Sequence, residues 1–126
     1  MDKPLKILFV FGTRPEVIKV APVIKEFRKY PMEFQCKVCI TGQHREMIDS
    51  LLNLFEVQVD YDLNLMRANQ NLEHITTTVL HEIGKIIDEV GCDYLFVQGD
   101  TTTAMAASMA AFYRRVKVAH IEAGLR

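Results

Sequence analysis

The fold class of this chain of 126 residues is indicated first by the segment Lys6-Ile-Leu-Phe-Val-Phe-Gly-Thr-Arg-Pro-Glu16. Its largely apolar part, residues 6–11, ends at a glycine, which is typical of a short strand that is buried on both faces. Pro15 suits the first turn of a helix, and Glu16 adds a negative charge at the positive end of the helix dipole. The stretch therefore predicts a strand that passes directly into a helix over residues 15–28.

The same alternation of strand and helix continues through the rest of the chain. Apolar spacing predicts strands at 34–40, 94–97 and 116–121, a weaker extended piece at 59–63, and helices at 44–55, 72–90 and 101–114. Asn71 is the expected N-cap of the helix at 72–90, and Gly91 is the left-handed residue expected to end it. Asp100 is the expected N-cap of the helix at 101–114. Pro22 predicts a kink or an early break in the first helix. The fold class is therefore α/β, a doubly wound parallel sheet, in one domain over residues 1–126.

Charge and composition exclude several kinds of partner. The chain carries 15 Lys and Arg against 16 Asp and Glu, so it lacks the excess of positive charge that binds a nucleic-acid backbone. No apolar run reaches the roughly 20 residues needed to span a bilayer, and no small-residue cleavage site follows the N-terminus, so we expect a cytoplasmic protein without membrane contact. An odd count of three cysteines fits reduced thiols.

Ligands of doubly wound sheets bind at the carboxyl ends of the strands, where helix N-termini point outward. Four polar loops occupy those places: Gly12-Thr-Arg-Pro15, Thr41-Gly-Gln-His-Arg45, Gly99-Asp-Thr-Thr-Thr103 and His120-Ile-Glu122. The first loop lacks the later glycines of a dinucleotide fingerprint, and the chain has no Gly-Lys-Ser/Thr sequence for a nucleoside triphosphate. The sequence therefore contains neither of the usual motifs for binding NAD or ATP.

Three other kinds of site are rejected on spacing. Cys36 and Cys39 lie three apart in a predicted strand, so they face opposite sides, unlike a thioredoxin-like pair. The pairs His81-Glu82 and His120-x-Glu122 begin like zinc motifs but lack the remaining ligands, and we predict no metal site. A receiver domain would need adjacent carboxylates after the first strand, where Thr13-Arg14 stands.

Four charged residues remain beside the predicted strand ends. Arg14 and Lys19 lie near the N-terminus of the first helix, and they could hold a phosphate. Asp100 and Glu122 end two strands that could be neighbours, and carboxylates can move a proton at a carbon acid. Together they suit a reaction that needs both proton transfer and stabilisation of negative charge.

Each candidate also has a purely structural explanation. Lys19 could be a solvated residue of an amphipathic helix, and Asp100 could serve only as an N-cap. His44 and His120 could be capping or core hydrogen-bonding side chains. Glu122 is harder to explain as an exposed residue without a function, because it follows an apolar strand and precedes Ala-Gly.

Five sequence blocks carry a family resemblance. They are Phe11-Gly-Thr-Arg-Pro-Glu16 with Lys19-Val-Ala-Pro22, Thr41-Gly-Gln-His-Arg-Glu-Met47, Tyr61-Asp-Leu-Asn64, Gly99-Asp-Thr-Thr-Thr103 and His120-Ile-Glu-Ala-Gly-Leu-Arg126. In this order and spacing they resemble the non-hydrolysing UDP-N-acetylglucosamine 2-epimerases of bacteria. The resemblance spans essentially the whole chain, and five blocks together are far more specific than any one of them.

The resemblance implies an activity and a fold. Such enzymes interconvert UDP-N-acetylglucosamine and UDP-N-acetylmannosamine without NAD, metal or any other cofactor, and supply amino sugars for surface polysaccharides. They eliminate UDP to leave 2-acetamidoglucal, then add UDP back with the proton returned to the opposite face of the second sugar carbon. Their fold is the two-domain glycosyltransferase B type, of which this chain would be the Rossmann-like N-terminal half.

The resemblance also assigns residues. Lys19, Asp100 and Glu122 match positions of the family active site, and Arg14 matches an arginine that contacts the UDP portion of the substrate. A second UDP-N-acetylglucosamine activates some members, and positions used there match Gln43, His44 and Gln70 of this chain. Glu46 and Asn69 differ from the glutamine and the arginine expected at that activator site.

The family chain continues into a second domain that supplies most nucleotide contacts, and the full-length enzyme is expected to be a homodimer. We therefore expect the segment of residues 1–126 to be the N-terminal domain of an epimerase, inactive by itself. Two alternatives stay open at the level of sequence. One is a non-catalytic module for nucleotide-sugar binding or assembly, and the other is the acceptor half of a glycosyltransferase.

Overall fold

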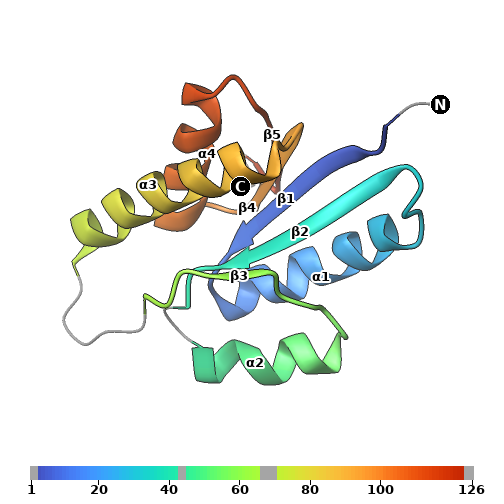
Figure 1. Ribbon diagram of the computed structural model, residues 1–126. Coiled ribbons are helices and arrows are strands. Elements are labelled where there is room, and N and C mark those ends of the chain that lie inside the picture. Colours follow the sequence, from blue (N-terminus) through green and yellow to red (C-terminus); the bar gives the residue numbers. More distant parts are fainter. Residues whose placement is uncertain (1–2, 43–44, 66–70, 124–126) are drawn as a thin grey trace.

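The computed structural model describes residues 3–42, 45–65 and 71–123, and within them a single parallel sheet forms the centre of the molecule (Figure 1). Its strands are β1 (Leu5–Phe11), β2 (Phe34–Ile40), β3 (Tyr61–Asp62), β4 (Tyr94–Gln98) and β5 (Lys117–Ile121). They are all parallel and lie in the order β3-β2-β1-β4-β5. The helices are α1 (Arg14–Arg28), α2 (Arg45–Leu54), α3 (Leu72–Val90) and α4 (Thr102–Tyr113).

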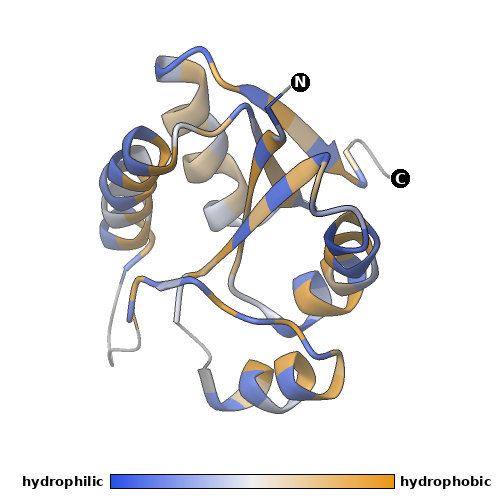
Figure 2. Ribbon diagram, turned by 45° about the vertical axis from the view of Figure 1, so that its right-hand side comes forward, coloured by the Kyte–Doolittle hydropathy of each residue, from blue (hydrophilic) through white to orange (hydrophobic). Residues whose placement is uncertain are grey.

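The central strand β1 divides its side chains between two hydrophobic cores. Leu8 and Val10 belong to the core that α3 and α4 cover, whereas Ile7, Phe9 and Phe11 belong to the core under α1 and α2. Successive residues of a strand point to opposite faces of the sheet, so a continuous apolar run fills both cores. Hydrophobic residues accordingly concentrate along the central strands (Figure 2). The predicted doubly wound α/β class is confirmed.

Helix α1 runs without a break through Pro22 to Arg28, so of the two expected effects of the proline, a kink or an early break, the break is wrong. Val20, Ala21 and Ile24 hold the buried face of this helix in the core on both sides of the proline. Pro22 itself is exposed, so the carbonyl oxygen left without its helical partner can be hydrated. Burial of the apolar face therefore outweighs the single lost hydrogen bond.

Both predicted ends of α3 are confirmed. The Asn71 side chain accepts a hydrogen bond from the backbone N–H of His74 at 2.7 Å, as an N-cap does. Gly91 ends the helix in the left-handed region, with φ of 66°. No helix in the described part of the chain is long and apolar enough to cross a membrane.

The strand order places the point where chain direction reverses between β1 and β4. The chain moves outward from β1 to β2 and β3, then crosses back to β4 and continues to β5. At this reversal the loops that follow β1 and β4 leave toward opposite faces of the sheet, which opens a crevice at the carboxyl ends of the strands. The loops at Gly12 and Gly99 flank that position, as the sequence predicts for a ligand site.

Candidate functional site

The loop between β1 and α1 is closed by Glu16. The Oε1 atom of its carboxylate accepts hydrogen bonds from the backbone N–H of Gly12 at 3.0 Å, the N–H of Thr13 at 2.9 Å and the Thr13 hydroxyl at 2.9 Å. Thr13 is the N-cap of α1 and accepts in turn from the N–H of Glu16, which completes a capping box. The Glu16 side chain is only 1% exposed. The backbone donors of this loop are therefore occupied from within the chain.

Gly12 fits this loop because it has no side chain. A Cβ atom added there would lie 2.0 Å from Oγ1 of Thr41, which is the residue after β2. The Thr41 N–H donates to the Phe11 carbonyl oxygen at 3.0 Å, so the ends of β1 and β2 are tied together at this point. The close approach demands glycine for reasons of space.

The loop between β4 and α4 corrects one sequence prediction. Thr101, not Asp100, is the N-cap of α4, and its hydroxyl oxygen accepts from the N–H of Ala104 at 3.1 Å. The Thr101 hydroxyl also donates to Oε2 of Glu16 at 3.1 Å. Asp100 lies one residue earlier and is exposed, so its structural explanation as an N-cap is wrong and its carboxylate faces the solvent.

Glu122 follows β5 in a left-handed backbone conformation, with φ of 61°. This conformation is uncommon for a residue with a side chain. The Gln98 amide donates to Oε1 of Glu122 at 2.5 Å, and the Lys19 ammonium lies 3.4 Å from Oε2. Glu122 is thus held by residues of β4 and α1, and its side chain is 25% exposed.

The His120 side chain on β5 forms a hydrogen bond with the backbone of the loop between β4 and α4. Its Nε2 lies 2.5 Å from the carbonyl oxygen of Gly99, where an Nε2–H group donates to the backbone. This contact supports the structural explanation of His120 as a hydrogen-bonding side chain. It also ties β5 to the loop that carries Asp100.

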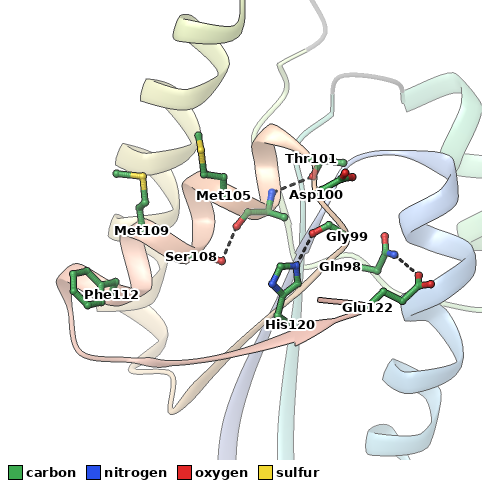
Figure 3. Close-up of a pocket in the computed structure, with 11 residues that line it drawn as sticks. Gln98, Gly99, Asp100, Thr101, Met105, Ser108, Met109, Phe112, His120 and Glu122 are labelled. Atoms are coloured by element: carbon green, nitrogen blue, oxygen red, sulfur yellow. Dashed lines mark hydrogen bonds between the residues drawn. The ribbon is translucent and has the colours of Figure 1, made fainter. Parts of the chain in front are cut away.

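Residues of β4, the β4–α4 loop, α4 and the end of β5 line an open pocket of about 780 Å³ (Figure 3). Its polar part contains Gln98, Gly99, Asp100, Thr101, His120 and Glu122, and its apolar part contains Ala104, Met105, Met109 and Phe112 of α4. The volume lies within the range of roughly 300–1,000 Å³ that is usual for small-molecule sites. A pocket with two carboxylates, a nearby ammonium group and an apolar wall can bind a polar ligand and move a proton on it.

The structure brings together three of the four charged candidates. Asp100 and Glu122 line one pocket, and Lys19 contacts Glu122. Arg14 is exposed in the first turn of α1 and does not line this pocket. The candidate activator residues Gln43, His44 and Gln70 lie outside the described residues.

Sequence reasoning missed three residues that shape the site: Glu16, Gln98 and Thr101. The spacing Thr13-x-x-Glu16 is a capping-box signature, so it could have revealed the local contacts of Glu16. No local signal connects Glu16 to Thr101, because the two are 85 positions apart. Gln98 likewise gains its partner only when β4 pairs with β5.

The two cysteines of β2 face opposite cores, as predicted. Cys39 is buried under α3 and α4, and Cys36 packs against the other core. Burial raises the pKa of both thiols above the usual 9.0, which disfavours a reactive thiolate. Among the described residues, no group of three His, Cys, Asp or Glu side chains is placed to hold a metal ion.

Comparison with known sequences identifies relatives of this chain. A family model described as UDP-N-acetylglucosamine 2-epimerase matches residues 25–126. A UDP-N-acetylglucosamine 2-epimerase of Neisseria meningitidis is 54% identical over 122 residues, which cover 97% of this chain and 32% of the relative. One from Escherichia coli K12 is 52% identical with the same coverage. The chain thus spans about a third of the length of the curated relatives it matches.

Solved structures agree with the sequence relatives. The crystal structure of the Neisseria meningitidis UDP-GlcNAc 2-epimerase bound to UDP-GlcNAc superposes with a TM-score of 0.92 at 54% identity, over 97% of this chain and 33% of that one. The Methanocaldococcus jannaschii UDP-GlcNAc 2-epimerase in complex with UDP-GlcNAc and UDP gives 0.87 at 32% identity, over 97% and 33%. This similarity supports the same fold over nearly the whole of the chain.

Proposed function

Because this chain belongs to the UDP-N-acetylglucosamine 2-epimerase family, we propose that it forms the N-terminal, Rossmann-like domain of an enzyme that interconverts UDP-N-acetylglucosamine and UDP-N-acetylmannosamine. The observation that carries this proposal is the pocket that Asp100 and Glu122 both line, with Lys19 beside Glu122. Proton removal from a weakly acidic carbon needs such positioned acid and base groups. No described feature favours a non-catalytic module or the acceptor half of a glycosyltransferase.

The proposed reaction is an elimination followed by an addition. A base removes the proton from the second sugar carbon, the bond from the first carbon to the UDP oxygen breaks, and 2-acetamidoglucal remains. UDP then adds back to the first carbon, and the second carbon receives a proton on its opposite face. Asp100 and Glu122 would serve in these proton transfers, and Lys19 would orient Glu122 and offset negative charge.

Arg14 would contact the UDP portion of the substrate. It is exposed in the first turn of α1 and lies outside the pocket with the carboxylates, as expected for a group that holds the leaving diphosphate rather than the sugar. Guanidinium groups such as that of Arg14 bind phosphates through paired, charge-assisted hydrogen bonds.

Gln43, His44 and Gln70 would contribute to an activator site for a second nucleotide sugar.

A second domain would complete the site. The matched relatives are about three times as long as this chain, and the pocket is open to solvent. Nucleotide sugars are commonly bound in clefts between domains, where both walls contribute contacts. We therefore propose that residues 1–126 are inactive alone, and that the full-length enzyme is a cytoplasmic homodimer of two-domain subunits.

The test follows the proton at the second sugar carbon. The full-length enzyme is incubated with UDP-N-acetylglucosamine in deuterated water, and the products are analysed by proton NMR. The proposal predicts UDP-N-acetylmannosamine with deuterium at the second carbon, because the returning proton comes from a group that exchanges with solvent. Absence of both epimerisation and deuterium uptake would refute the activity.

A further inference from the structure

Glu16 is a buried carboxylic side chain whose contacts extend beyond its own loop. Among the buried polar side chains of the described residues it is the one that carries a charge, and it is 1% exposed. Burial of a carboxylate is costly unless hydrogen bonds replace its hydration. In a capping box the glutamate contacts the N-cap backbone N–H, for which one oxygen is enough, so the contact of the second oxygen is additional to the cap.

The two oxygens of Glu16 face different loops. Oε1 accepts from Gly12 and Thr13, within the loop between β1 and α1. Oε2 accepts from the hydroxyl of Thr101, 85 positions away in the loop between β4 and α4. One carboxylate therefore joins the two loops that flank the reversal of the sheet.

Thr101 completes this link. Its hydroxyl donates to Glu16 and at the same time accepts from the N–H of Ala104 at 3.1 Å, at the N-terminus of α4. A hydroxyl has one proton to donate, so both of its roles are compatible and its orientation is fixed. The N-termini of α1 and α4 are thus held in one hydrogen-bonded chain.

The linked loops carry the proposed site residues. Arg14 lies two residues before Glu16, Lys19 lies on the next turn of α1, and Asp100 directly precedes Thr101. We infer that Glu16 is a positioning residue, which fixes the cations of α1 relative to Asp100 without touching the substrate. This inference rests on the proposed function for its catalytic consequence, whereas the link between the loops is a property of the fold.

The kinetic test compares variants of the full-length enzyme: Glu16→Ala, Thr101→Val, the double variant, and Thr101→Ser, which keeps the hydroxyl. We expect kcat to fall about tenfold or more in both single variants with KM within about threefold, because a misplaced catalytic group slows the chemical step. The double variant should be no worse than the poorer single variant, and Thr101→Ser should recover most of kcat. Ile83→Val, on the buried face of α3, is the control for a loss of core packing away from the pocket.

Two kinetic results would overturn the inference. One is a double variant whose losses in kcat multiply, because the two residues would then act independently. The other is a Glu16→Ala variant with unchanged kcat, or with a loss no greater than that of Ile83→Val.

A second measurement does not depend on turnover. Hydrogen exchange followed by mass spectrometry on full-length Thr101→Val should show faster exchange in the peptide that contains the Gly12 and Thr13 amides, although the substitution is far away in sequence. Exchange in the peptide that covers β2 should not change. Unchanged exchange at Gly12 and Thr13 would disprove the link even in an active enzyme. If the wild-type protein lacked epimerase activity, faster exchange would still confirm the link, and only the proposed function would fail.

Discussion

The Lys19 ammonium lies 3.4 Å from the Glu122 carboxylate, although the two residues are 103 positions apart in the chain. Lys19 extends from α1, which follows the central strand, and Glu122 ends the edge strand β5. Gln98 holds the other oxygen of the same carboxylate. Both oxygens of Glu122 are therefore oriented by residues from two other elements.

We predict that Lys19→Met affects turnover far more than stability. The Lys19 side chain is 52% exposed, so its ion pair should contribute less than about 1 kcal/mol to folding. Loss of a charge beside the proposed reaction centre should lower kcat of the full-length enzyme by roughly a hundredfold. Thermal unfolding and steady-state kinetics measure the two effects separately.

The matched control is Lys29→Met, at the C-cap of the same helix. Lys29 pairs with Glu26 at 3.0 Å but lies outside the pocket, so turnover should stay at the wild-type level. Equal losses of turnover in both variants would show that the position of Lys19 beside Glu122 has no special role.

Glu122→Gln and Asp100→Asn should each lower kcat of the full-length enzyme by about two orders of magnitude or more with the fold intact. Both changes keep the size of the side chain and remove the group proposed to transfer a proton. Glu26→Gln and Asp88→Asn, at exposed ion pairs outside the pocket, are the paired controls. Near wild-type turnover in both site variants, with unchanged circular dichroism, would contradict the assignment of the site.

Gly12→Ala should destabilise the chain by about 2 kcal/mol, because the new methyl group would overlap Thr41 at the end of a rigid strand. Gly84→Ala on α3 is the contrasting variant. Its Cβ would meet the guanidinium of Arg114, which can move away, and alanine favours the helix. Urea unfolding should therefore show a lower midpoint for Gly12→Ala and an equal or higher one for Gly84→Ala. The reverse order would disprove the close packing of Gly12.

The stability of the chain should fall as pH rises from about 9 to about 11. Burial, together with the neighbouring Asp93, raises the pKa of Cys92 from 9.0 to about 11. Between those values the unfolded chain has lost a proton that the folded chain keeps, so unfolding releases protons and becomes easier with rising pH. Urea midpoints measured from pH 8 to 11 should decline less steeply for Cys92→Ala than for the wild type. Identical slopes would show that the buried thiol does not contribute.

Local patterns in the sequence predicted most of the fold. The run before Gly12 identified a strand buried on both faces, and Asn71 and Gly91 marked the ends of α3. The N-cap of α4 was misassigned because Asp100 and Thr101 are both good capping residues in adjacent positions, and only the path of the backbone selects between them. The predicted span of α1 is confirmed, whereas the possible break at Pro22 is wrong because packing of the helix against the sheet holds it together.

The alternation of strands and helices and their buried faces follow from the amino-acid sequence, because apolar residues recur every two positions in strands and every three to four in helices. The four polar loops follow as well, since each stands directly after a predicted strand. Which loop residues contact one another depends on the order of the strands, which brings together positions 85 and 103 residues apart. The contacts of Glu16 with Thr101 and of Lys19 with Glu122 therefore exist only once β4 and β5 pair beside β1.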